Sequence, residues 1–244
     1  RLYTCSENAL EWVRAHSGNS VLVERIRRLK DKAVCRELLA PLYADFFFRQ
    51  VTLEELAALP FEALKVPCVL KPAVGFFSLG VHRIENAAQW EAAKAAVARD
   101  AALWREQYPP EVVEGGRFLQ EEYIQGEEYA VDVYYDRQGR AVVCNILRHE
   151  FFSDADVSDR LYYTSREIIE NRLNEFEAWF NRVNGPLELR NFPVHVELRR
   201  DAGGAGIAEP GPSGPASRLL VVLDLALSRD VERSVGALPG VLLI

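Results

Sequence analysis

The chain has 244 residues, of which 49% are hydrophobic and 27% are charged, a composition typical of a folded globular protein. Its formal net charge is −7 and its basic residues form no stripe, which argues against nucleic acid or an anionic membrane surface as the main partner. No apolar run is long enough to span a bilayer, no signal-peptide pattern opens the sequence, and the four cysteines lack metal-ligand spacing, so we expect a cytoplasmic protein with reduced thiols.

The first half of the sequence predicts helices on either side of a few strands. Apolar side chains recur at helical spacing over residues 6–16 and over residues 24–43, where the pattern stops near Pro41. Residues 44–51 predict a strand, and residues 52–59 a short helix with Thr52 as N-cap and Glu55 completing a capping box. Strand-like runs at 66–72 and 81–86 flank a glycine loop, and the alanine-rich residues 87–108 predict a long helix.

The second half predicts mainly antiparallel strands. Residues 117–136 and 140–151 alternate apolar and polar side chains around the turn sequence DRQGR, which indicates a hairpin. A helix is expected over 166–184 and a strand over 192–201. Residues 202–217 are rich in glycine and proline, and residues 219–227 are apolar without a clear period. This order predicts an α+β fold of two mixed lobes with largely antiparallel sheets.

Lys71 stands at the end of an apolar run in VLKPAVGFFSLGV, just before a loop that contains Gly75 and Gly80. Glycines let the backbone approach a ligand and turn its N–H groups toward an anion, while a lysine adds a point charge. The order differs from a Walker loop and from a kinase loop, where the glycines precede the lysine. An ordinary hairpin with a solvent-facing lysine explains the pattern equally well.

Carboxylates form two further candidate sites. In QEEYIQGEEYAVD, Glu121 and Glu128 lie on either side of a bend at Gly126, and a carboxylate such as Glu128 can accept both hydroxyls of a ribose; a solvated acidic edge strand is the alternative, and the pattern alone favours it. Glu197 and Glu209 could share Mg²⁺, or Glu197 could form a surface ion pair with a neighbouring arginine.

Taken in order along the chain, these motifs resemble those of the ATP-grasp superfamily, especially carboxylate–amine ligases of the D-alanine–D-alanine ligase and biotin carboxylase types, from about Arg25 to about Asp201. The resemblance implies that KDKAVCREL supplies a first phosphate-binding lysine and VLKPAVGFFSLGV a second lysine with its glycine-rich flap. It implies adenine and ribose contacts in LQEEYIQGEEY, and a metal ligand in HVELR. The implied nucleotide-binding residues are Lys32, Lys71, Gly75, Ser78, Gly80, Glu121, Glu122, Tyr123, Ile124 and Glu128, and the implied metal ligands are Glu197 and Glu209.

The same resemblance implies a fold in which two lobes enclose a nucleotide cleft. Residues 1–44 would be a leading helical segment, the stub of a missing N-terminal lobe; residues 45–121 would form the lobe with the lysine and flap, and residues 122–244 the carboxylate lobe. The sequence departs from the family at EPGPSG, which lacks the Asn and Arg of the closing metal and phosphate motif. This departure indicates either divergence with lost catalysis or an altered reading frame.

The function implied is that of an ATP- and Mg²⁺-dependent ligase. It would transfer the γ-phosphoryl group of ATP to a small-molecule carboxylate, and an amine would attack the resulting acyl phosphate; no catalytic residue is assigned. Two alternatives stay open. In the first, the chain would be a nucleotide-binding remnant of this fold without catalytic activity. In the second, it would be a structural or interaction protein whose lysines and acids are ordinary surface groups.

Overall fold

The computed structural model describes residues 9–75, 79–107, 115–150, 161–201 and 219–222. Its helices are α1 (Ala9–His16), α2 (Ser20–Lys30), α3 (Lys32–Leu39), α4 (Leu53–Ala58), α5 (Ala87–Gln107) and α6 (Arg166–Leu187), with 3-10 turns at Ala40–Leu42 and Phe61–Ala63. Its strands are β1 (Phe48–Thr52), β2 (Cys68–Pro72), β3 (His82–Ile84), β4 (Arg117–Glu122), β5 (Gly126–Tyr135), β6 (Ala141–His149), β7 (Tyr162–Tyr163), β8 (Phe192–Asp201) and β9 (Leu219–Val222).

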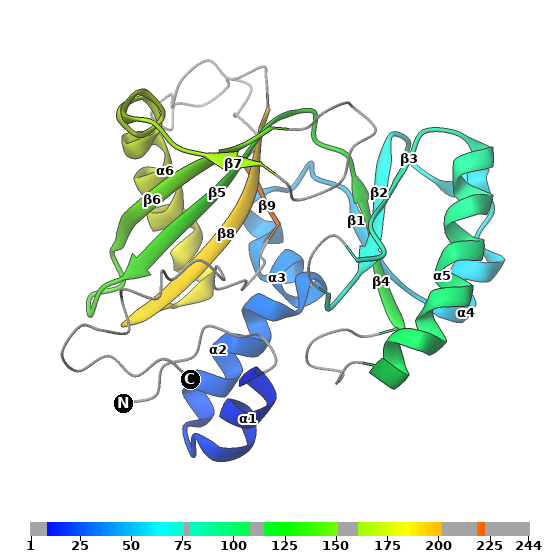
Figure 1. Ribbon diagram of the computed structural model, residues 1–244, viewed down its shortest axis with the longest axis horizontal. Helices are drawn as coiled ribbons and strands as arrows, with labels where there is room; N and C mark the ends of the chain where they lie inside the picture. Colours follow the sequence, from blue (N-terminus) through cyan, green and yellow to red (C-terminus); the bar gives the residue numbers. More distant parts are fainter. Residues whose placement is uncertain (1–8, 76–78, 108–114, 151–160, 202–218, 223–244) are drawn as a thin grey trace.

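These strands form two antiparallel sheets, so the predicted α+β class is confirmed. Sheet A has the strand order β1-β4-β2-β3, and sheet B has the order β7-β6-β5-β8-β9. In Figure 1, α4 and α5 lie on the outer side of sheet A, α6 lies against sheet B, and α2 and α3 run between the two sheets. Within the described ranges, none of the helices combines the length and apolar character that crossing a membrane requires.

Each sheet has its own apolar core. In sheet A, Leu70 and Phe118 pack with Trp90 of α5, and all three side chains are buried. In sheet B, alternate residues of β5 and β8 pack against α6 and the helices α2 and α3, among them Tyr135 and Val196. Because side chains alternate between the faces of a strand, the intervening residues of β5 and β8 point away from this core.

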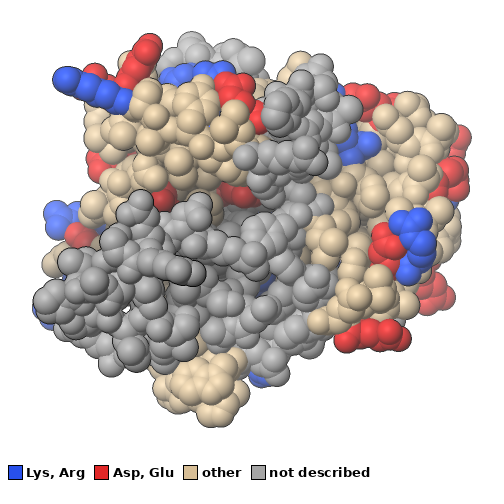
Figure 2. All heavy atoms as spheres, viewed as in Figure 1, with Lys and Arg blue, Asp and Glu red and all other residues tan. Residues whose placement is uncertain are grey.

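The opposite, polar face of sheet B carries charged side chains on adjacent strands. On β5 it presents Glu128 and Asp132, four residues apart, and on β8 it presents His195, Glu197 and Arg199, each two residues from the next. On the side of the molecule shown in Figure 2, Lys and Arg lie interspersed with Asp and Glu among the described atoms. The polar face of sheet B is therefore a place where functional groups gather by strand register.

The helix expected over 24–43 is broken in two at Asp31. This residue has an extended backbone (φ −84°, ψ 103°), so it ends α2 and begins α3. Its Oδ1 accepts hydrogen bonds from the backbone N–H groups of Ala33 and Val34, at 3.0 and 3.2 Å. Aspartate is a good N-cap, and this local preference overrides the continuous apolar pattern that predicted one helix.

The strand expected over 117–136 is also divided, close to the bend predicted at Gly126. Its first part is β4 in sheet A and its second part is β5 in sheet B, with residues 123–125 between them. Gly126 has φ 156°, a value that glycine adopts more readily than other residues. A single segment therefore connects the two sheets, and we call residues 122–125 the hinge.

Gly80 provides a test of the packing beneath the glycine loop. It has φ +70°, and a Cβ atom there would lie 2.5 Å from Cη2 of Trp104. Gly80→Ala should lower the free energy of unfolding by about 2 kcal/mol or more, because backbone strain and a steric clash add. Gly18→Ala is the matched control: Gly18 has φ +61° with nothing within 4 Å, so only the strain applies. Urea unfolding followed by circular dichroism measures both, and equal losses would contradict the clash.

Candidate nucleotide site

The N-terminus of α3 is fixed to the end of β2 through Lys32. The backbone N–H of Lys32 donates to the carbonyl oxygen of Ala73 at 2.8 Å. Its side chain is buried, and Nζ donates to the carbonyl oxygen of Gly75 at 2.9 Å. Lys30 is buried as well, and its Nζ lies 3.4 Å from the same oxygen. Two ammonium groups thus lie beside the first glycine of the loop.

Lys71 reaches this region from β2, on the face of sheet A that is turned away from α5. Its ammonium group contacts Oε1 of Glu121, on the neighbouring strand β4. The other oxygen of that carboxylate, Oε2, accepts a hydrogen bond from Nε of Arg36 at 2.8 Å. All three side chains are at most 5% exposed. We call this group the Arg36–Glu121–Lys71 triad.

Charge and burial shift the pKa values within the triad. Burial lowers the pKa of Lys71 to about 8; Glu121 opposes this effect, whereas the positive charges of Arg36 and Lys32 add to it. Burial acts to raise the pKa of Glu121, but Arg36 and Lys71 outweigh it and lower that pKa to about 2. The carboxylate is therefore ionised at neutral pH.

The hinge is held by contacts from both sheets. The carboxylate of Glu122 lies 3.2 Å from Nζ of Lys65. The Tyr123 hydroxyl accepts a hydrogen bond from Arg199 of β8 at 2.7 Å, and the guanidinium of Arg83 on β3 lies 4.1 Å from the centre of its ring. The carbonyl oxygen of Ile124 lies 3.5 Å from the same Arg199 nitrogen. Tyr123 therefore contacts side chains from each of the two sheets.

Glu128 has a defined partner on each oxygen. Nδ1 of His149 lies 2.8 Å from Oε1, and Arg199 lies 2.8 Å from Oε2. Burial acts to raise the pKa of Glu128, but His149 and Arg199 lower it. The ring of His149 is stacked on Tyr162 with centroids 4.3 Å apart. The carboxylate is thus ionised and fixed in orientation.

Glu197 lies on the same face of sheet B, one row of residues beyond Glu128. Its register partner on β5 is Ala130, while the register partner of Glu128 on β8 is Arg199. Oε1 of Glu197 accepts a hydrogen bond from the Tyr162 hydroxyl at 3.2 Å. In the part of the chain that the structure describes, no group of three or more His, Cys, Asp or Glu side chains is arranged to hold a metal ion.

Not all of the residues singled out in the sequence can be placed. Ser78 and Glu209 lie outside the described residues. Lys32 meets Gly75 at the base of the loop, and Lys71 meets Glu121 on the neighbouring strand. Gly80, in contrast, packs against Trp104 of α5. The roles of these residues toward a nucleotide stay predictions.

Sequence reasoning missed Arg36 and Lys30, and it did not connect His149 or Arg199 with Glu128; Arg199 was considered only as an ion-pair partner of Glu197. Arg36 follows Lys32 by four residues on one helix, a spacing that places both on the same face of the helix. Arg199 follows Glu197 by two residues on one strand, which likewise gives them a common face. Both spacings can be read from the sequence and would have placed these arginines beside the predicted site residues. The partner of Glu128 on β6, His149, depends on strand pairing and had no local signal.

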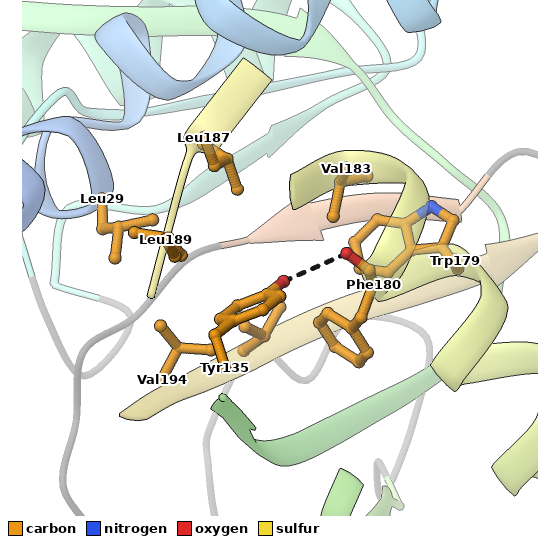
Figure 3. A pocket seen from close by; sticks show the side chains of 9 residues that line it. Leu29, Tyr135, Trp179, Phe180, Val183, Leu187, Leu189 and Val194 are labelled. Carbon is orange, nitrogen blue, oxygen red and sulfur yellow. Dashed lines mark hydrogen bonds between the residues drawn. The ribbon is translucent and has the colours of Figure 1, made fainter. Parts of the chain in front are cut away.

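A pocket beneath α6 is separate from this group of residues. It is lined by apolar core side chains of α2, α6, β5 and β8, including Leu29, Trp179 and Val194. Tyr135 is one of the lining residues, and its hydroxyl donates to the carbonyl oxygen of Phe180 at 3.2 Å (Figure 3). The pocket is a packing feature of the sheet B core and offers no charged group to a nucleotide.

The architecture matches solved ligase structures over nearly the whole chain. An L-amino acid ligase from Bacillus licheniformis is similar with a TM-score of 0.62 and 20% identity, over 90% of this chain and 49% of that one. A biotin carboxylase from Campylobacter jejuni is similar with a TM-score of 0.60 and 15% identity, over 93% of this chain and 47% of that one. The chain spans about half the length of these structures. At such identities the likeness shows the fold.

The family is shown by the sequence itself. No curated protein sequence matches the chain. Residues 64–212, more than half of the 244 residues, match the family model of the ATP-grasp domain. That range contains Lys71 and its loop, the hinge, Glu128 and Glu197. The predicted family is therefore confirmed, and this chain is a member of the ATP-grasp family.

Proposed function

We propose that this chain binds ATP together with Mg²⁺ and acts as a ligase that joins a small-molecule carboxylate to an amine. The observation that carries the proposal is the pair of buried lysines next to the glycine loop: Nζ of Lys32 donates to the carbonyl oxygen of Gly75, and Lys71 lies on β2 four residues before that glycine. Two buried ammonium groups repel one another, and an anion placed between them removes that repulsion. The triphosphate of a nucleotide is an anion suited to this arrangement.

The proposed adenine and ribose contacts lie at the hinge. Backbone groups of residues 122–124 would meet the adenine edge, because a backbone offers both donors and acceptors. The N–H groups of Glu122 and Tyr123 already donate to backbone carbonyl oxygens, so the proposed contacts fall to the other backbone groups of this segment. Glu128 would accept the ribose hydroxyls. Its carboxylate is already oriented by His149 and Arg199, and each oxygen retains a further lone pair for a ligand.

Glu197 is the described residue proposed to hold Mg²⁺. A carboxylate oxygen suits a hard cation that prefers oxygen ligands and keeps contacts to substrate phosphates. When bound, Mg²⁺ would neutralise phosphate charge. The second proposed ligand, Glu209, lies outside the described residues.

The proposed reaction begins when a carboxylate oxygen of the substrate attacks the γ-phosphorus of ATP. The bond to the β-phosphate oxygen breaks, giving ADP and an acyl phosphate; the amine then attacks the acyl carbon and inorganic phosphate leaves. The protein would contribute charge neutralisation and positioning by Lys32 and Lys71 rather than covalent catalysis. Exclusion of water would protect the acyl phosphate from hydrolysis.

A second candidate function is nucleotide binding without ligation. The sequence EPGPSG favours it, because this segment lacks the Asn and Arg expected in the closing motif. The two candidates share the same ATP site and differ only in turnover.

Lys71→Ala should weaken binding of the ATP analogue AMP-PNP with Mg²⁺ by at least tenfold, because a buried positive charge is lost from the proposed phosphate site. Isothermal titration calorimetry measures the effect. Lys94→Ala is the control: this lysine lies on α5, away from the site, where it pairs with Glu91. Equal affinities of Lys71→Ala and the unmodified chain would contradict the assignment.

The pH dependence of binding should follow the pKa of Lys71. Because that pKa is lowered to about 8, Lys71 in the free site loses its positive charge as pH rises above 8, and phosphate binding must then restore its proton. The affinity for AMP-PNP with Mg²⁺ should therefore decrease between pH 7.5 and 9.5. Lys71→Arg should lack most of this decrease, because arginine stays protonated throughout the range. A parallel decrease in both proteins would assign the effect to another group.

Ligase activity can be tested without knowing the substrates. Phosphate release from ATP is measured with mixtures of amino acids and carboxylic acids, and hydroxylamine is added to trap an acyl phosphate as a hydroxamate. Release that depends on a carboxylate, together with hydroxamate formation, is expected for a ligase. Binding of AMP-PNP with no release from any mixture would support nucleotide binding alone.

A further inference from the structure

We propose that Arg36 is a positioning residue for the nucleotide site: by holding one oxygen of Glu121, it keeps the ammonium group of Lys71 aimed and its charge available for phosphate. The inference rests on the proposed function, since it concerns how that site is built. Arg36 itself would make no contact with the nucleotide.

The two oxygens of Glu121 are divided between two cations from different elements. Nε of Arg36, on α3, donates a hydrogen bond to Oε2 at 2.8 Å, and the ammonium group of Lys71, on β2, forms an ion pair with Oε1. The carboxylate is 3% exposed, so its partners are protein groups rather than bulk water. Held in this way, Glu121 meets Lys71 through one oxygen only. An ammonium group has three donors, and this arrangement leaves donors for a further acceptor.

The charge balance of the triad depends on Arg36. A buried pair of Glu121 and Lys71 would be neutral, and it would offer a phosphate group little electrostatic attraction. With Arg36 the triad contains two cations and one anion, which leaves a net charge of +1 beside Lys32. Inside a protein, where screening is weak, one unit of charge strongly affects the binding of an anion.

The position of Arg36 is set independently of any ligand. Its guanidinium lies 5.4 Å from the ring centre of Phe46, and its side chain is 5% exposed. Since α3 also carries Lys32 and is fixed to β2 through the carbonyl oxygen of Ala73, one short helix supplies a proposed phosphate contact and the partner of Glu121. An arginine is suited to this structural role because its planar guanidinium stays charged when buried.

Three proteins test the inference: the unmodified chain, Arg36→Met and Arg36→Lys. Calorimetry gives the affinity for AMP-PNP with Mg²⁺, and ligand-detected NMR follows binding of adenosine, which lacks phosphates. Arg36→Met should weaken AMP-PNP binding at least tenfold and change adenosine binding less than threefold. Arg36→Lys keeps a positive charge beside Oε2 of Glu121, so its AMP-PNP affinity should stay within threefold of the unmodified chain.

An Arg36→Lys variant as weak as Arg36→Met would show that a cation held on Glu121 is not what the site requires, and this overturns the inference. So would an Arg36→Met variant with unchanged affinity. If Arg36→Met does not fold, Arg36→Lys decides alone, because a tenfold loss of AMP-PNP affinity there has the same meaning. Arg28→Met on α2, where Arg28 pairs with Glu24, is the control and should bind both ligands normally. Failure of the unmodified chain to bind AMP-PNP would instead refute the proposed function.

Discussion

The carboxylate of Glu121 is the contact on which the arrangement of the candidate site depends. It lies on β4 and binds Arg36 from α3 and Lys71 from β2, so it fixes three elements that are distant in sequence. A buried ion pair that loses one partner leaves an uncompensated charge, which destabilises a protein by about 3–5 kcal/mol. Each member of the triad therefore constrains the position of the other two. The triad therefore fixes Lys71 on β2, the strand that leads into the glycine loop.

Sheet B contributes the rest of the site through strand period and register. Alternate residues of β5 and of β8 fill the apolar core against α6. The residues between them lie on the opposite face of the sheet, where Glu128, Glu197 and Arg199 are found. Arg199 links this face to the hinge, because it contacts Glu128 and also the hydroxyl of Tyr123. The hinge thus joins the sheets by side-chain contacts as well as by the chain itself.

Much of this organisation was predictable from sequence, because it rests on local patterns. Apolar periodicity gave α5 and α6, the capping residues gave α4, and the order of lysine, glycine loop and glutamates gave the family. The break at Asp31 was missed, because an apolar pattern continued through it while a side-chain cap interrupted the helix. The pairing of Arg36 with Glu121 joins residues 85 positions apart. Such a contact follows from tertiary packing and has no counterpart in a local pattern.

The break at Asp31 has a geometric consequence for the whole molecule. Each residue of an α-helix turns the chain by about 100°, so an uninterrupted helix would carry every later side chain around the axis in fixed steps. Because Asp31 leaves the helical conformation, α3 can run in a new direction, and its side chains start from a new angle around the helix axis. The same side chain also binds Arg117 at 2.7 Å through Oδ2, which attaches the corner between the two helices to β4. Because Asp31 separates the two helices, Leu29 can pack into the core of sheet B while Lys32, three positions later, contacts Gly75 in the loop that follows β2 of sheet A.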